Sequence, residues 1–220
     1  MARPAPALAS RVVPVQEREV RKRTPRGEKT RARVLEAAAA AITSEGFAVA
    51  TTNRIAERAG VSWGVLQYHF GDKAGLLSAL VEHAFSGLRA GFESMGFEGE
   101  TAADRVASVL DVAWALFQTP MSRASIEVLG NIRFEGRSAR SAGRRVDAMQ
   151  REIARLGREA LERAIGRSPR AERVQSLVWM SIRGWTLAAM QGTPFDFERE
   201  RAALLELVAE SLEMDRNERI

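Results

Sequence analysis

The side chains best suited to recognition chemistry in this 220-residue sequence gather in one stretch, Trp63–Phe70. Within it Gln67 can donate and accept hydrogen bonds, Tyr68 brings a hydroxyl and His69 an imidazole. If Leu66 marks the buried side of a helix, a rotation of about 100° per residue leaves the opposite side and its flanks to Trp63, Gly64, Val65, Gln67, Tyr68 and His69. Amide groups suit base edges, hydroxyl and imidazole groups suit phosphate oxygens, and glycine permits close backbone approach. The pattern therefore favours contact with nucleic acid.

The residues around Trp63–Phe70 predict a helix-turn-helix. A hydroxyl from Thr51 or Thr52 caps a preceding short helix, and Gly60 ends it. Ser62 then caps the second helix. Two helices joined by a turn of about three or four residues that contains glycine are typical of this motif.

A small apolar core would hold the crossing of these two helices. Ile55 and Ala59 lie one helical turn apart, as do Leu66 and Phe70, and Val61 lies in the turn between the helices. An ordinary helical hairpin inside a larger core is the alternative interpretation. Such a hairpin needs neither this turn sequence nor an outer face rich in aromatic and amide groups, so we favour the helix-turn-helix.

These residues resemble the N-terminal DNA-binding domain of TetR-family transcriptional regulators. The resemblance covers roughly residues 28–81 and runs in order, without gaps, through Thr51-Thr52, Ile55-Ala56, Ala59-Gly60-Val61-Ser62, Leu66, Tyr68-His69-Phe70, Lys73 and Leu76-Leu77. Three positions depart from it: the family commonly has a basic residue at Trp63, a small hydroxyl residue at Val65 and a tyrosine at Gln67. The departures leave the operator sequence open.

The resemblance implies a regulator of transcription, which we take to be a repressor, that binds double-stranded DNA. Its second short helix would enter a major groove. Phosphate contacts are expected from Thr51, Thr52, Tyr68, His69 and Lys73. Base contacts are expected from Asn53, Trp63, Gly64, Val65 and Gln67, and the DNA-binding set is completed by Arg54 and Ser62.

Positive charge is concentrated at the N-terminal end of the chain. Residues 1–33 carry ten basic and three acidic side chains, so their net charge of +7 exceeds the +5 of the whole chain. Residues 1–26 also hold four of the seven prolines, and we expect them to form a disordered basic arm that reaches DNA. A solubilising tail without DNA contact is the alternative.

Composition argues against several classes of protein. The chain has no cysteine, which excludes disulfides, thiolate metal sites and a cysteine nucleophile. No apolar run approaches the roughly 18–20 residues of a membrane span, and the N-terminal residues lack the apolar core of a signal peptide. We therefore expect a cytoplasmic, nucleoid-associated protein with no membrane partner.

The sequence contains little evidence of a catalytic site. The two histidines are His69, on the expected DNA-facing helix, and His83. The motifs of zinc peptidases, of serine hydrolases and of phosphate-cradling loops are absent. We expect no enzyme, no cofactor and no metal. A small helical enzyme, and an interaction module that retains an unused helix-turn-helix, are the rival interpretations.

Apolar periodicity predicts an all-α fold of about nine helices. They would cover approximately residues 27–45, 53–59, 63–70, 73–95, 102–119, 121–134, 142–166, 169–191 and 194–214. Caps at Asp72, Ser168 and Thr193 would begin three of them, with Pro169 and Pro194 in first turns. We expect the arm at 1–26, a helix-turn-helix domain at 27–72, and a helical effector-binding and dimerisation domain at 73–220.

Tryptophan and methionine are concentrated in the second half of the chain. In the resembling family the C-terminal helices enclose a small molecule, here expected to be an apolar effector. The expected lining consists of Trp114, Phe117, Gln118, Met121, Glu127, Asn131, Met149, Trp179 and Arg183. Simple core packing of the large side chains is the alternative.

The last two expected helices carry more apolar surface than a helix on the surface of a monomer needs. In the resembling family these helices pair with their copies across a twofold axis, which implies a homodimer. The expected pairing residues are Trp185, Leu204, Leu205 and Val208. Packing inside the subunit's own core is the alternative.

Overall fold

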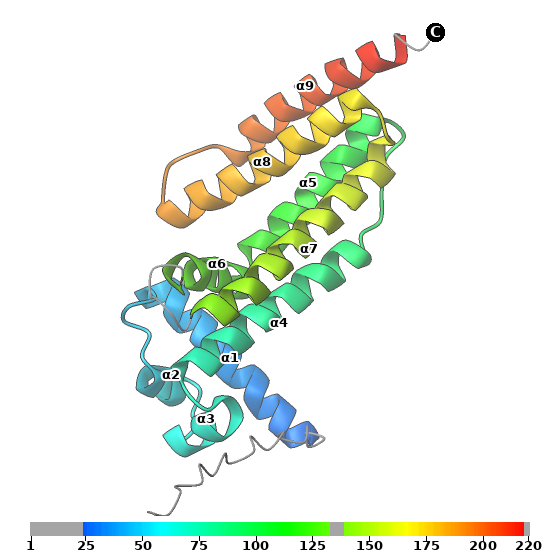
Figure 1. Cartoon of the computed structure of the whole chain (residues 1–220). Helices are drawn as coiled ribbons and strands as arrows, with labels where there is room; N and C mark the ends of the chain where they lie inside the picture. Colours follow the sequence, from blue (N-terminus) through cyan, green and yellow to red (C-terminus); the bar gives the residue numbers. More distant parts are fainter. Residues whose placement is uncertain (1–23, 133–138, 218–220) are drawn as a thin grey trace, which may run out of the picture.

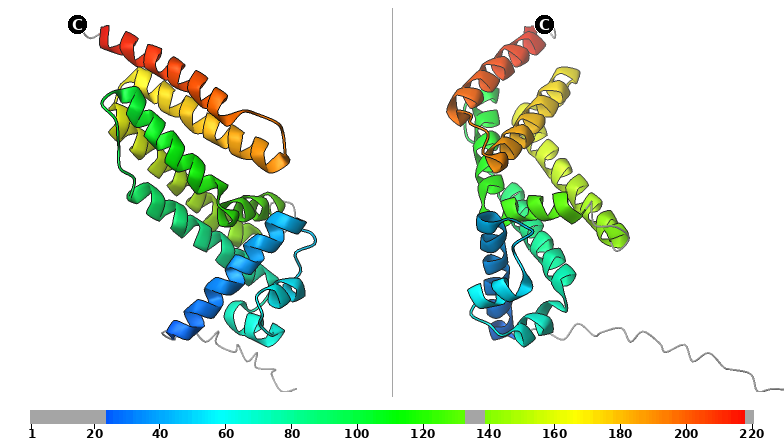
Figure 2. Two further views of the ribbon diagram at one scale, coloured as in Figure 1. Left: turned by 180° about the vertical axis from the view of Figure 1, so that it is seen from behind. Right: turned by 90° about the vertical axis from the view of Figure 1, so that its left-hand side faces the viewer.

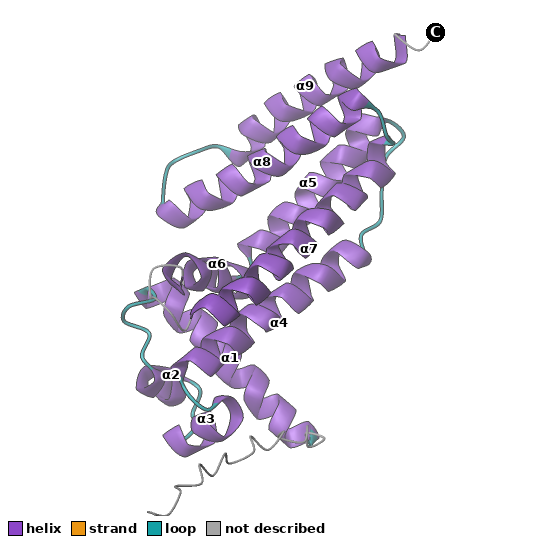
Figure 3. Cartoon of the chain, in the orientation of Figure 1, coloured by secondary structure: helices purple, strands orange, loops and turns teal. Residues whose placement is uncertain are grey.

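The computed structural model describes residues 24–132 and 139–217, and every regular element within these ranges is an α-helix (Figures 1 and 3). In chain order they are α1 (Pro25–Glu45), α2 (Thr52–Arg58), α3 (Trp63–Phe70), α4 (Lys73–Glu93), α5 (Ala102–Gln118), α6 (Pro120–Ile132), α7 (Ala139–Ile165), α8 (Pro169–Gln191) and α9 (Phe197–Asn217). The predicted all-α class is confirmed. Most of the expected arm lies outside the described residues, and its last two residues, Pro25 and Arg26, belong to α1.

Side-chain caps explain where most of these helices begin. An oxygen of the N-cap residue accepts a hydrogen bond from a backbone N–H three residues further on at Thr24, Thr51, Ser62, Asp72, Thr101 and Ser168. Thr51 Oγ1 lies 3.4 Å from Arg54 N, which decides between the two candidate threonines. The caps predicted at Ser62, Asp72 and Ser168 are confirmed.

The start of the last helix differs from the prediction. α9 begins at Phe197, after the cap and first turn predicted at residues 193 and 194. Asp196 is its cap, because Asp196 Oδ1 accepts a hydrogen bond from Arg199 N at 3.2 Å. The ring of Phe197 also stacks on Trp114 of α5 at a centroid distance of 4.5 Å. The predicted start at residue 194 is therefore wrong, because the cap that begins the helix is Asp196.

The first hydrophobic core holds α1, α2, α3 and the beginning of α4 together. Leu66 and Phe70 join it from α3, as the periodicity predicts. Ala124, Val128 and Leu129 join it from α6, which packs against both α1 and α4. The helix-turn-helix therefore shares its core with a helix from the second half of the chain.

The second hydrophobic core joins the remainder of α4 to α5, α7, α8 and α9. Leu88 and Phe92 of α4 belong to it, whereas Leu76 and Leu80 of α4 belong to the first core. Phe85, halfway along α4, packs against both. α4 is therefore a continuous helical connection between the two cores.

The helices are arranged along the length of the molecule. α2 and α3 lie at one end, and α8 and α9 lie side by side at the other (Figures 1 and 2). α4, α5 and α7 run between these ends. Within the described ranges no helix is long and apolar enough to cross a membrane.

Candidate functional site

The outer face of α3 is the most exposed aromatic surface near the helix-turn-helix. Leu66 is 1% exposed in the first core, whereas Tyr68 is 80% exposed and Trp63 is 52% exposed. Gly64 and Gln67 are exposed on the same face, and Val65 and His69 are half-buried at its edges. Ser62 Oγ accepts a hydrogen bond from Val65 N, and Gly71 ends the helix with φ of 81°. The helix is thus held by its inner side and leaves its outer side free for a partner.

An arginine of α1 holds the other end of α3. Arg31 Nη1 donates a hydrogen bond to the His69 carbonyl oxygen at 3.3 Å, and its guanidinium lies 4.7 Å from the centre of the Phe70 ring. A positive charge at the C-terminal end of a helix also interacts favourably with the helix dipole. Arg31 therefore positions α3 from behind. The two residues lie 38 positions apart in the chain, so no local pattern in the sequence indicates this contact.

The turn and the arginines of α2 complete the motif. Gly60 adopts φ of 61°, and Val61 N donates to the Ala56 carbonyl at 3.0 Å, which closes the turn between α2 and α3. Arg54 Nη1 lies 2.6 Å from Glu45 Oε2, and Arg58 Nη1 lies 3.0 Å from Glu45 Oε1. Both arginines are therefore paired with the end of α1. Sequence reasoning included Arg54 in the site but missed Glu45 as its partner.

The junction of α3 and α4 is tight. The Lys73 ammonium, at the first position of α4, lies 5.0 Å from the centre of the Phe47 ring. At Gly75 an added Cβ atom would lie 2.0 Å from the Phe70 carbonyl oxygen, so only glycine fits there. Gly75 was not singled out from the sequence, although its place three residues after the Asp72 cap marks the first turn of α4.

The helix-turn-helix and the fold of most of the chain resemble known regulators. Residues 34–80 match the family model described as bacterial regulatory proteins, tetR family. A chain described as a TetR-family transcriptional regulator from Rhodococcus sp. is 27% identical, with a TM-score of 0.57 over 84% of this chain and 99% of that chain. The DNA-binding region of this chain thus matches the TetR family, and the similarity of fold extends over most of the chain.

Two further proteins are similar to this chain, one in sequence and one in fold. The HTH-type transcriptional regulator BetI of Paraburkholderia phytofirmans is 40% identical over 58 residues, which make up 26% of this chain and 30% of that protein. The sequence match thus spans less than a third of that relative's length. A transcriptional regulator from Rhodococcus sp. Rha1 shares the fold, with a TM-score of 0.63 at 22% identity over 83% of this chain and 96% of that one.

In the second half of the chain, the structure brings together part of the expected effector lining. The Trp179 ring lies 6.1 Å from the Phe117 ring and 6.4 Å from the Phe92 ring, between centroids. At Gly157 an added Cβ would lie 2.6 Å from the Trp179 ring, so α7 and α8 approach closely here. The amide nitrogen of Gln118, next to Phe117, is buried, and no acceptor within the described residues pairs with it.

The other expected lining residues are spread over different places. Trp114 stacks on Phe197 and packs edge-on against Phe195, at the start of α9. Met121 and Met149 pack against the first core. Arg183 is exposed on α8. Helical spacing indicates which residues share a face, but it does not indicate which core that face meets.

Glu127 and Asn131 lie on α6 beside the helix-turn-helix. Glu127 Oε1 accepts a hydrogen bond from the Phe47 backbone N–H at 2.6 Å, between residues 80 apart in the chain. Asn131 Nδ2 donates to the Glu127 carbonyl at 2.9 Å. Phe47 follows Gly46, whose φ of 88° ends α1. The carboxylate of α6 thus holds the turn that leads from α1 to α2.

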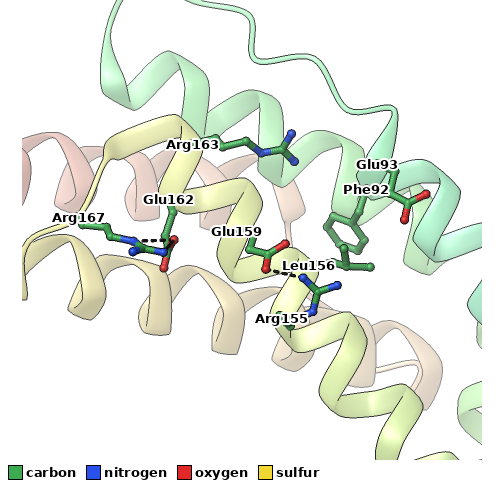
Figure 4. Close-up of a pocket in the computed structure, with 8 residues that line it drawn as sticks. All are labelled: Phe92, Glu93, Arg155, Leu156, Glu159, Glu162, Arg163 and Arg167. Carbon is green, nitrogen blue, oxygen red and sulfur yellow. Dashed lines mark hydrogen bonds and ion pairs between the residues drawn. The ribbon is translucent and has the colours of Figure 1, made fainter.

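A pocket of about 650 Å³ opens between the end of α4 and α7 (Figure 4). Phe92 and Leu156 contribute its apolar part, and its charged lining consists of Glu93, Arg155, Glu159, Glu162, Arg163 and Arg167. Hydrogen bonds to Glu152 and Glu159 raise the pKa of the Arg155 guanidinium, and the bond from Arg155 lowers the pKa of Glu152. None of the nine expected lining residues belongs to this pocket, but Phe92 also contacts Trp179.

The expected pairing residues are distributed differently from the prediction. Leu204 and Val208 are 5% and 0% exposed, because they face the subunit's own second core. Trp185 packs edge-on against Phe197, and Leu205 is half-buried. The apolar side chains left exposed on the same two helices, each about half exposed, are Leu177, Met180, Leu187, Leu207 and Met214.

Proposed function

We propose that this chain is a homodimeric, ligand-responsive transcriptional repressor that a small apolar effector releases from a palindromic operator. The outer face of α3 carries the proposal: Tyr68 and Trp63 are exposed while Leu66, on the opposite side, is buried. Exposed aromatic side chains on a helix that is held rigidly from behind are suited to a partner surface. In a TetR-type helix-turn-helix that partner is the major groove of DNA.

The proposed DNA contacts are of two kinds: contacts to phosphates position the protein, and contacts to base edges read the sequence. Thr51 uses one lone pair of its hydroxyl as the cap of α2, and its O–H can still donate to a phosphate oxygen. Lys73 adds a positive charge at the junction of α3 and α4. Gln67 and Trp63, one turn apart on α3, would meet base edges. Such a protein acts on chromosomal DNA, so we place it in the cytoplasm, at the nucleoid.

In the proposed dimer, an exposed apolar stripe on α8 and α9 packs against the same stripe of a second copy. The stripe consists of Leu177, Met180, Leu187, Leu207 and Met214. Large apolar side chains gathered on adjacent helices favour burial against a second copy. Gly184 lies on the same face of α8, and an added Cβ there would meet no atom within 4 Å. A glycine at this position allows close approach of two helices. Twofold pairing would set two α3 helices on half-sites about 34–36 Å apart, or a multiple of this distance.

The proposed effector site surrounds the ring cluster of Phe92, Phe117 and Trp179. Aromatic walls with few polar groups suit an apolar ligand. The unpaired amide nitrogen of Gln118 supports a ligand that also carries one hydrogen-bond acceptor, because a buried donor without a partner is costly. Binding would act through α4, which contributes to both cores, and through α6, which belongs to the first core and also packs against α5. It must favour an arrangement that DNA does not.

A genome-wide map of bound sites tests the proposal. Wild-type protein is expected to occupy sites that share one palindrome, and Tyr68→Ala is expected to lose them. Arg158→Ala, an exposed residue of α7, is the control and should keep them. Repeating the map with candidate effectors tests release. Sites that share no sequence, or a map unchanged by Tyr68→Ala, would contradict the proposal.

A further inference from the structure

Trp63 is an exposed indole at the first position of α3. Half of its surface is open to solvent, and it takes part in none of the aromatic ring pairs found among residues 24–132 and 139–217. Exposing a large apolar ring to water is unfavourable. The position therefore suits a residue that is covered when a partner binds.

The surroundings of Trp63 leave its ring accessible to a groove of a partner molecule. Ser62 caps the helix, so the first turn of α3 is rigid. At the next residue, Gly64, an added Cβ would meet only Ser62 Oγ, at 3.9 Å. No bulky side chain at that position would keep a groove away from the ring. The first turn of a recognition helix is also the part that commonly reaches base edges.

The chemistry of indole limits what Trp63 can read. Its single polar atom is a donor, and it has no acceptor, so it cannot form the paired hydrogen bonds that arginine makes with guanine or glutamine with adenine. Its large surface is apolar. Among the base edges of the major groove, the C5 methyl of thymine is the apolar group.

We propose that Trp63 reads thymine methyl groups in the major groove of each half-site. The inference rests on the proposed DNA-binding function and specifies the base feature that this residue recognises. Burying one methyl group against the indole should change affinity about fourfold. Packing of the ring on sugar and phosphate, the competing arrangement, would contribute affinity without preference for any base.

Replacement of thymine by deoxyuridine tests the inference, because it removes the methyl group and keeps the base-pairing edge. The operator is first selected from random duplexes with wild-type protein, and each thymine is then replaced in turn. At one or two positions in each half-site, deoxyuridine should weaken wild-type binding about fourfold. Trp63→Ala should bind the thymine and deoxyuridine duplexes equally at those positions, and Trp63→Phe should retain part of the difference.

Tyr68→Ala is the control and should keep the deoxyuridine effect while binding all duplexes more weakly. Melting curves of each variant verify folding. If Trp63→Ala weakens binding but every deoxyuridine effect is the same as in wild type, the ring contacts sugar and phosphate and the inference is overturned, while the proposed function stands. If wild-type protein selects no sequence at all, the proposed function itself fails.

Discussion

Leu66 and Tyr68 lie two residues apart on α3, yet the first is almost fully buried and the second is mostly exposed. At the scale of residues, the folding role and the proposed recognition role therefore lie on opposite sides of one short helix. Arg31 and Gly75 lie against the backbone at the C-terminal end of α3. They fix the position of the helix without contributing to its outer face.

Substitution of Leu66 should damage folding. Leu66→Ala leaves a cavity in the first core and should lower the free energy of unfolding by roughly 2–5 kcal/mol. Tyr68→Ala removes an exposed side chain, so the melting temperature should hardly change, whereas operator affinity should fall by about 1–3 kcal/mol. Thermal melting and DNA titration on the two variants check this contrast. Equal melting temperatures for Leu66→Ala and wild type would contradict the assignment of faces.

Lys73 should contribute charge to DNA binding without reading sequence. Lys73→Ala should weaken binding to all duplexes about equally and reduce the slope of log affinity against log salt by about one unit per half-site, because one phosphate contact is lost. Arg158→Ala removes the same charge from an exposed position on α7 and should leave the slope unchanged. Titrations at several salt concentrations measure both. Identical slopes for the two variants would rule out a phosphate contact at Lys73.

At the scale of elements, α6 is the part of the second half that reaches the helix-turn-helix. It packs against α1 and α4, places three apolar residues in the first core, and holds the turn after α1 through Glu127. A carboxylate that accepts a backbone N–H makes a stronger hydrogen bond than a neutral group does. Movement of α6 would therefore displace the turn that leads to α2.

Loss of the Glu127 carboxylate should loosen that turn. Glu127→Ala leaves the Phe47 N–H without its acceptor, which should cost about 1–3 kcal/mol and speed hydrogen exchange at this amide. Glu127→Gln retains a side-chain oxygen and should preserve most of the protection. Amide exchange followed by NMR tests the pair. Unchanged exchange at Phe47 in the alanine variant would show that the contact does not hold the turn.

At the scale of the whole molecule, the proposed DNA-binding and dimerisation surfaces lie at opposite ends. Helices α8 and α9, which carry the exposed stripe, lie at the end opposite α3 (Figure 1). Between them, α4 contributes to both cores. A dimer joined at the stripe would leave both recognition helices free at the far end. The separation of those two helices would then depend on the angle of α4.

A charge within the stripe should separate the subunits without unfolding them. Leu207→Glu would bury an unpaired carboxylate in the dimer and should give a monomer that has lost operator binding, because one helix-turn-helix reads too few base pairs. Leu204→Ala, one turn away but buried in the subunit's core, should instead lower the melting temperature. Sedimentation should find wild type at twice 24.2 kDa. A wild-type monomer that binds its operator tightly would contradict the dimer.

The sequence by itself determined the features that depend on neighbours within one or two helical turns. The all-α class, the two faces of α3 and the caps at Ser62, Asp72 and Ser168 follow from such local spacing. Helical rotation and backbone capping act over three or four residues, so they can be read along the chain.

Only the tertiary structure decided which partner each buried face meets. The apolar pattern of α9 is the same whether Val208 packs inside its own subunit or against a second copy, and the structure places it inside. Glu127 and Phe47, 80 residues apart, show no sequence signal of their contact. Phe197, the first residue of α9, stacks on Trp114 of α5, and local spacing does not indicate this contact either. An apolar stripe requires burial but does not specify the neighbour, because the hydrophobic effect is non-directional.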